Sequence, residues 1–286
     1  MSFLSSANLF NKTTLPVSHE NIVQTIQTFT DNIFLSRDGA TSGHKWDRGS
    51  DYHLDVPAKQ GPATTMTKQL VETYNTYTNF DGQSDYWSCR ISEHKSIDED
   101  LYREKIVGNL NGSVFKKETG EWELPEKLSY RCTNEKNYFH AIESVTVLHD
   151  NVFLESASAE NVSSPSGGWV EIEALYKFSP VLKKRVFNEW VYVVKPFKVS
   201  GDSSTEVSYV LSIRSDHNQD GHKSEHVPAY YVSIEKLQYN YTTKQFTWLM
   251  CTASDCKGIV PQFVQNIMIN KAVVHDVPLF FSYIIK

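Results

Sequence analysis

Near its carboxyl end the sequence reads QFTWLMCTA (residues 245–253), then SDCKG (254–258), then an apolar-rich stretch over residues 259–285. The first segment alternates as a strand does, the second is a polar break, and the third predicts one long helix. Its apolar side chains share one helical face: Val260, Phe263, Val264, Ile267, Val274, Pro278, Phe281 and Ile285. Roughly 25 helical residues at about 1.5 Å each would cross a whole sheet. The stretch therefore predicts either a helix that closes a sheet or, more simply, an amphipathic helix packed on another core.

The composition is that of a folded protein with a sizeable core. The chain has 286 residues, of which 40% are apolar and 13% aromatic, enough for one large domain or two small ones. Its formal charge is −6 and it has no long basic block, which argues against a nucleic-acid partner. The cysteines Cys89, Cys132, Cys251 and Cys256 form no CxxC pair, as expected for reduced thiols in the cytoplasm.

Neither end of the sequence predicts export or membrane insertion. The first twenty or so residues lack a positively charged start and a sustained apolar run, so we read no secretory signal. Polar side chains interrupt the stretch 259–285 too often for a lipid-facing span. We therefore expect a cytoplasmic protein.

The rest of the chain is predicted to be mainly strands. Helices are predicted at 19–36, with Ser18 or Asn21 as the cap, at 67–77, and at 97–109 behind a capping box formed by Ser96 and Glu99; residues 37–62 read as a loop. Strands are predicted at 86–94, 121–124, 128–133, 140–149, 151–158, 168–178, 185–194, 206–214, 230–239 and 246–253, with a break beginning at Lys195-Pro196. This order describes an α+β fold whose antiparallel sheet is closed by the last helix. Residues 1–84 are expected to form a helical and loop segment packed on a domain of residues 85–286.

Four motifs in order carry a resemblance to a known family. They are WSCRISEH (87–94), LKKRVF (182–187), YVSIEK (231–236), and WLMCTASDCKG (248–258) followed by Pro261, Phe263, Val264, Gln265 and DVPLF (276–280). Residues 85–286 thereby resemble a fungal family of START-like (helix-grip, SRPBCC superfamily) domains of unknown function. The resemblance implies a curved antiparallel sheet wrapped around a long C-terminal helix. It also implies a tunnel between them for a hydrophobic ligand of the sterol or phospholipid class.

Strand alternation suggests which side chains would meet such a ligand. Tyr231, Ser233 and Glu235 share one face of their strand, and Trp248 and Thr252 share one face of the next, although the sequence leaves open which face looks inward. The ligand-binding residues that we predict are Trp87, Arg90, Glu173, Arg185, Tyr231, Ser233, Glu235, Trp248, Thr252, Phe263, Ile267 and Lys271. The plainer alternatives are core packing for the aromatic residues, an ion pair with Glu173, Glu189 or Glu235 for Arg185, and solvent exposure for Lys271.

The predicted function is non-catalytic binding of a hydrophobic small molecule or lipid, with transfer and a transient membrane contact as further options. No protein partner is indicated. Motifs of hydrolases, phosphate-binding loops and zinc proteases are missing, so we predict no catalytic residue and no cofactor. A protein-interaction or regulatory module with a filled tunnel is the alternative. A cyclase- or hydrolase-like enzyme using Glu235, His140 or Tyr231 as acid and base is a more distant one.

The histidine-rich segment 216–226 and Pro278 are two further features of the sequence. His217, His222 and His226 lie among acidic residues between 216 and 226, but their spacing matches no established ligand pattern, so we predict no metal site. Pro278 is expected to kink or end the last helix, which would leave residues 279–285 either packed as usual or as a separately moving, membrane-touching tail.

Overall fold

The computed structural model describes residues 2–40, 43–60, 63–80, 82–153, 165–178, 183–217, 226–257 and 262–285, with the side chains of the last helix described from Ile269 onward. The helical elements are η1 (Ser2–Leu4), α1 (His19–Arg37), the π-helical η2 (Leu101–Val107), α2 (Gly108–Leu110), α3 (Ser129–Glu135) and α4 (Gln262–Ile284). The strands are β1 (Asp47–Gln60), β2 (Ala63–Phe80), β3 (Gln83–His94), β4 (Val114–Lys116), β5 (Glu121–Glu123), β6 (Ile142–Phe153), β7 (Gly167–Tyr176), β8 (Arg185–Val199), β9 (Asp202–Arg214), β10 (Val227–Asn240) and β11 (Gln245–Asp255).

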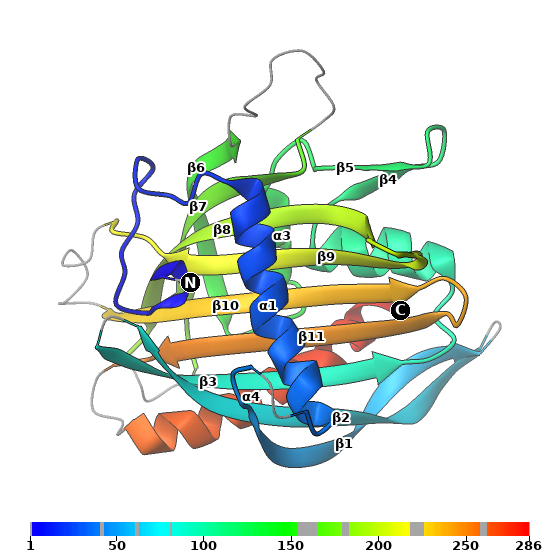
Figure 1. Cartoon of the computed structure of the whole chain (residues 1–286), viewed down its shortest axis with the longest axis horizontal. Helices are drawn as coiled ribbons and strands as arrows, with labels where there is room; N and C mark the ends of the chain where they lie inside the picture. Colours follow the sequence, from blue (N-terminus) through cyan, green and yellow to red (C-terminus); the bar gives the residue numbers. More distant parts are fainter. Residues whose placement is uncertain are drawn as a thin grey trace.

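Nine of these strands form one sheet in the order β1-β2-β3-β11-β10-β9-β8-β7-β6 (Figure 1). All neighbours in this order are antiparallel, and β4 and β5 form a separate hairpin. The start of β10 also pairs in parallel with the start of β8. Most strands follow one another along the chain, but β3 is hydrogen-bonded to β11, so the last strand joins the two parts of the sheet.

Helices cover both faces of the sheet. Helix α1 crosses one face, and α4 lies behind the other (Figure 1). The two faces of β3 therefore contact different helices. Trp87 of β3 packs on Phe29 of α1, with ring centroids 4.8 Å apart. His94, on the opposite face of the strand, stacks on Phe281 of α4 at 4.2 Å. The expected α+β helix-grip fold, a large antiparallel sheet with a closing C-terminal helix, is confirmed. None of the helices in the described ranges is long and apolar enough to span a bilayer.

Helix α1 begins and packs as its sequence predicts. The Ser18 side chain accepts a hydrogen bond from the Asn21 backbone N–H, which caps the helix. The inward face carries buried Ile22, Ile26, Phe29 and Ile33 at helical spacing, all part of the core on this side of the sheet.

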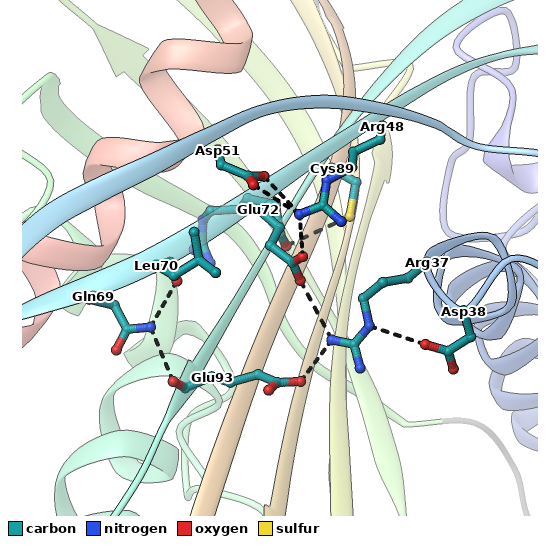
Figure 2. Close-up of polar contacts among 10 residues, drawn as sticks. Arg37, Asp38, Arg48, Asp51, Gln69, Leu70, Glu72, Cys89 and Glu93 are labelled. Carbon is teal, nitrogen blue, oxygen red and sulfur yellow. Dashed lines mark hydrogen bonds and ion pairs between the residues drawn. The ribbon is translucent and has the colours of Figure 1, made fainter.

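A network of ion pairs connects the end of α1 to the sheet (Figure 2). Arg37 Nη1 lies 2.8 Å from Glu93 Oε1 on β3 and 3.6 Å from Glu72 Oε2 on β2. Glu72 Oε1 lies 2.8 Å from Arg48 Nη2 on β1, and the same Nη2 is 2.9 Å from Asp51 Oδ2. One helix and three strands are therefore linked by alternating positive and negative groups at a partly exposed position.

The first testable prediction concerns this cluster. Arg37→Ala is expected to lower the free energy of unfolding by about 1 kcal/mol, because it leaves Glu72 and Glu93 close together without their shared cation. Urea unfolding measures the change, and Lys45→Ala, whose pair with Asp47 is far more exposed, should leave the midpoint unaltered. Equal effects of the two variants would show that the cluster adds no stability.

The segment 37–62 is not the expected loop, and 67–77 is not a helix. They contribute β1 and β2, which pair along nearly their whole length. In β1 the exposed Asp51, His53 and Asp55 alternate with Tyr52 and Leu54, which pack against the core around α4. Strands at a sheet edge often carry charge on their open side, and this polar face obscured the two-residue period. The Thr and Tyr content of 67–77 suits a strand better than a helix.

Three local predictions are wrong, and in the first case a residue far along the chain decides the structure. Residues 129–135 form helix α3 rather than a strand, since Asp150 Oδ1 of β6 accepts the Ser129 backbone N–H at 3.1 Å. Ser96 adopts a positive φ of 59° and caps nothing; Asp98 Oδ1 instead accepts the Leu101 N–H at 2.7 Å, where η2 begins. Strand β8 continues through Pro196, where a shift of register accommodates the missing N–H.

Helix α4 does not end at Pro278. It continues to Ile284, and Phe280, Phe281 and Ile284 beyond the proline are buried against the sheet side of the molecule. The residues after Pro278 are thus part of the core, and the idea of a separately moving tail is not supported.

Candidate ligand-binding cavity

A cavity of about 310 Å³ lies between the sheet and helices α2, α3 and α4. Strands β7, β8, β10 and β11 form its floor, with Tyr176, Phe187, Tyr231 and Trp248 among the lining residues. Helix α4 supplies Ile269, Ala272, Val273 and Asp276, and α3 supplies Arg131 and Glu135. The cavity therefore occupies the gap between sheet and closing helix that the helix-grip arrangement predicts.

Aromatic rings form much of the wall. The Phe187 ring lies edge-on to Tyr176 at 5.0 Å and to Tyr231 at 6.3 Å between centroids. Tyr138 and Trp248 each contact Phe280 of α4, at 5.3 and 5.2 Å. Such rings offer wide apolar surfaces and hold their positions by packing on one another.

One ion pair crosses the cavity wall. Arg131 Nη2 of α3 lies 2.8 Å from Glu235 Oε2 of β10, and its Nε donates to the Leu110 carbonyl at 2.8 Å. The other Glu235 oxygen accepts Trp248 Nε1–H at 2.7 Å. Both side chains are nearly buried. Each has two polar partners: Glu235 accepts from Arg131 and Trp248, and Arg131 contacts the Glu235 carboxylate and the Leu110 carbonyl.

Three more carboxyl groups in the cavity wall, those of Glu135, Glu189 and Asp276, have no cation as close as the one beside Glu235. Burial, with nearby Glu135, raises the pKa of Glu189 to about 8, although a Ser212 hydroxyl opposes the shift. Burial raises the pKa of Asp276 to about 7 against the opposing effect of Arg90. The pKa of Glu135 is raised too, chiefly by burial, while Arg131, at 3.6 Å, opposes the rise. Near neutral pH the cavity thus holds protonated or half-protonated carboxyl groups.

Several buried polar atoms around the cavity have no hydrogen-bond partner among the described residues. They are Thr252 Oγ1, Asp276 Oδ1, and Nε and Nη1 of Arg90. Arg90 lies behind the cavity wall, its guanidinium carbon 3.8 Å from the Trp248 ring centroid, and burial lowers its pKa. Unpartnered buried polar groups are costly, so Thr252 and Asp276 are positions where a bound molecule would supply a partner.

The structure brings together part of the predicted ligand-binding set. Arg185, Tyr231, Glu235, Trp248 and Thr252 all line the cavity. The face of β8, β10 and β11 that bears them is the one turned toward α4. Arg185 has no ion pair with a described residue; its Nε donates to the Cys256 carbonyl at 3.2 Å.

The remaining predicted residues lie elsewhere. Trp87 belongs to the core under α1. Glu173 lies on the face of β7 opposite to Tyr176, which lines the cavity. Lys271 is exposed on α4. Ser233 is buried between Tyr231 and Glu235 without lining the cavity. The side chains of Phe263 and Ile267 lie outside the described residues.

Most of the cavity residues that sequence reasoning missed carried a usable signal. Phe187 and Glu189 follow Arg185 at two-residue spacing on one strand, so they share its face. Arg131 and Glu135 stand four residues apart on one side of α3, whereas the strand that was expected at 128–133 ended before Glu135. Asp276 was hidden because it sits beside the apolar face of α4.

The other proposed site types gain nothing from the geometry. His140 is exposed and does not line the cavity, so it does not meet Glu235 and Tyr231 as an acid–base group. Most of the histidine-rich segment, residues 218–225, lies outside the described residues. Within the described ranges no cluster of three metal-ligating side chains occurs.

Solved structures provide a comparison of fold. Human STARD10 is similar with a TM-score of 0.46 and 10% identity, covering 87% of this chain and 77% of that one. Human StAR-related lipid transfer protein 5 gives 0.44 and 10%, covering 93% and 96%, and the human StarD13 (DLC2) lipid transfer and protein localization domain gives 0.44 and 8%, covering 94% and 98%. The likeness is one of fold alone.

Sequence comparisons give one match. No curated protein matches the chain. A family model described as "Protein of unknown function (DUF3074)" matches residues 87–284, which include most of β3, then α3, the strands β6 to β11 and α4. The chain therefore belongs to this family.

Proposed function

We propose that this protein binds a small hydrophobic ligand in the cavity between the sheet and α4, without catalysis, as a carrier or sensor of that ligand. The observation that carries the proposal is a cavity of about 310 Å³ whose walls are largely aromatic and aliphatic, with a few polar groups facing in. Pockets of about 300 Å³ and more with this composition are typical small-molecule sites.

The volume bears on the ligand class. It lies at the lower end of the roughly 300–1,000 Å³ range of ligand pockets, which suits one acyl or alkyl chain or a compact ring system better than a two-chain phospholipid. The resemblance implies a sterol or a phospholipid. Among such ligands, the volume of the cavity favours small or single-chain molecules.

The alternatives have less support. A protein-interaction module with a filled tunnel would need side chains where this open volume lies. The enzyme alternative uses Glu235 as an acid or base, yet Glu235 is engaged by Arg131 and Trp248. Burial also raises the pKa of Tyr231 far from neutrality.

The second prediction tests the cavity directly. Ala272 of α4 lines the cavity and is itself exposed, so Ala272→Trp places an indole where the cavity meets solvent. Binding of a fluorescent alkyl probe is expected to weaken at least about ten-fold, equivalent to about 1.4 kcal/mol, because the indole occupies the ligand's volume.

Mass spectrometry of lipids extracted from the purified protein complements this measurement. We expect one reproducible ligand class from the natural protein and its loss from Ala272→Trp, with circular dichroism reporting an intact fold. Lys271→Trp, one residue away but directed to solvent, is the matched control. Unchanged probe affinity in Ala272→Trp, or no copurifying ligand and no probe binding, would overturn the proposal.

A further inference from the structure

Arg185 is a buried positive charge in the cavity wall. It lines the cavity, and only 4% of its surface is exposed. Its Nε donates to the Cys256 carbonyl at 3.2 Å, and its Nη1 donates to the Lys183 carbonyl. Within the described ranges, no carboxylate lies within ion-pairing distance of its guanidinium. Because arginine keeps its charge in any protein environment, this position holds a cation that is shielded from water and has only backbone partners.

The acidic side chains of the cavity wall do not supply the missing partner. Glu235 is paired with Arg131. Glu189 shares a strand face with Arg185 but lies four residues farther along β8, a distance of about 13 Å. Asp276 interacts mainly with charged groups on β3, α3 and β10. In the part of the chain that the structure describes, the charge of Arg185 is therefore unmatched.

The guanidinium of Arg185 has donors left for a ligand. Arginine carries five N–H groups, and the carbonyl groups of described residues accept two of those of Arg185. Three remain, one on Nη1 and two on Nη2. This end of a guanidinium binds a carboxylate through two parallel hydrogen bonds. An acidic group placed here would satisfy both the remaining donors and the charge.

Aromatic rings surround this end of the cavity. Tyr176 lies opposite Arg185 in the pairing of β7 with β8, and Phe187 follows Arg185 on the same strand face. The Tyr176 ring lies 5.0 Å from that of Phe187 and stacks on Phe178 at 5.4 Å between centroids. Phe178 lines the cavity and is also exposed, so this end reaches solvent. A hydrocarbon chain thus finds an apolar wall directly beside the buried charge.

We propose that the ligand is a single-chain amphiphile with an anionic head group, which binds Arg185 while its chain lies along Phe187 and Tyr231. This rests on the proposed function, since it assumes that the cavity holds a ligand. The two rings are edge-on to each other at 6.3 Å and continue the wall inward from Arg185. Because folding has already taken Arg185 out of water, binding costs the desolvation of the ligand's head group alone.

The experiment uses the full chain and three probes with the same hydrocarbon chain: dodecanoate, dodecanol and dodecylamine. Titration calorimetry near neutral pH gives the affinity of each. Dodecanoate is expected to bind at least about ten-fold more tightly than dodecanol, because only the carboxylate matches the charge of Arg185. Dodecylamine is expected to bind no more tightly than dodecanol.

Variants separate the head group from the cavity. Arg185→Gln should remove most of the preference for dodecanoate while leaving dodecanol binding in place. Arg185→Lys should keep part of the preference, because an ammonium retains the charge without the two-pronged geometry. Arg37→Gln is the matched control, since it changes the net charge equally but lies in the ion-pair network at the end of α1. It should keep the full preference.

Cys256 provides a second measurement, made on the natural protein. It lines the cavity and is partly exposed, whereas Cys89, Cys132 and Cys251 are buried. Arg185 opposes the rise that burial causes in the pKa of Cys256, so the thiol lies near the guanidinium. Dodecanoate is expected to slow alkylation of Cys256 by iodoacetamide, as read by mass spectrometry of peptides. Acetate, which has the same head group and no chain, should not slow it at the same concentration.

The outcomes distinguish the two proposals. Equal affinity for dodecanoate and dodecanol, a full preference for dodecanoate in a folded Arg185→Gln, or equal protection of Cys256 by acetate and dodecanoate would overturn the anionic head group and keep the hydrophobic cavity. If Arg185→Gln does not fold, as judged by circular dichroism, the protection of Cys256 decides. Failure of all three probes to bind, with no difference between the natural protein and Ala272→Trp, would overturn both proposals.

Discussion

Arg131→Met is expected to lower the free energy of unfolding by about 3–5 kcal/mol, because it leaves Glu235 nearly buried without its cation. The same change removes the 2.8 Å hydrogen bond to the Leu110 carbonyl. Desolvating a carboxylate without a partner is among the most costly single changes available in a folded protein. Urea unfolding followed by tryptophan fluorescence measures the loss.

A second variant separates loss of charge pairing from loss of packing. Arg131→Met combined with Glu235→Gln should recover more than half of the lost stability, since the amide oxygen can still accept the Trp248 Nε1–H. Arg37→Ala provides the comparison with a more exposed ion pair. If Arg131→Met lowered the free energy of unfolding no more than Arg37→Ala does, the buried ion pair across the cavity would stabilise the fold no more than an exposed one.

Stability is expected to fall as pH rises from about 5 to about 8, because folding raises the pKa values of both Glu189 and Asp276. An unfolded glutamate loses its proton near pH 4.5, whereas folding raises the pKa of Glu189 to about 8. Between these values the folded state binds more protons than the unfolded state, so raising the pH favours unfolding. At about 1.4 kcal/mol per pH unit, the loss caused by Glu189 alone is on the order of 4 kcal/mol by pH 8.

The acidic side of the profile is set by a different group. Burial lowers the pKa of His94 to about 3, so below pH 6.5 an unfolded histidine takes up a proton that His94 does not. Stability therefore also declines toward acid, and a maximum is expected on the acidic side of neutrality.

Urea unfolding across the pH range tests this account. Glu189→Gln should remove about half of the fall in stability with rising pH, so that the variant gains on the natural protein between about pH 5.5 and 8.5, while Asp276 still contributes its part. Parallel curves for the two proteins would show that Glu189 titrates in the folded state as it does in an unfolded chain.

The sequence predicted what depends on local periodicity. The two-residue period of β10 and β11 placed Tyr231 with Glu235, and Trp248 with Thr252, and helix α1 followed from its apolar spacing and Ser18 cap. What the period could not decide was which face of the strands looks toward the cavity, because helices bury both faces and neither is polar throughout.

The missed parts depend on residues far apart in the chain. Helix α3 is capped by Asp150, and its Arg131 meets Glu235 from more than a hundred residues away. The edge strand β1 looked like a loop because its open side is charged. Charge pairs and caps of this kind leave no mark on a local pattern, which is why the carboxyl groups of the cavity emerged only with the fold.

The pairing of β3 with β11 also bears on how the protein is made. Residues 88–94 are bonded to 246–252, so on the ribosome the hairpins formed by β1, β2 and β3 must wait for nearly the whole chain to emerge. Until then the inner edge of β3 stays open, and joining it to the rest of the sheet closes a very long loop, which slows folding. The newly made protein thus passes through a stage with two half-sheets and an exposed edge, the kind of intermediate that chaperones protect.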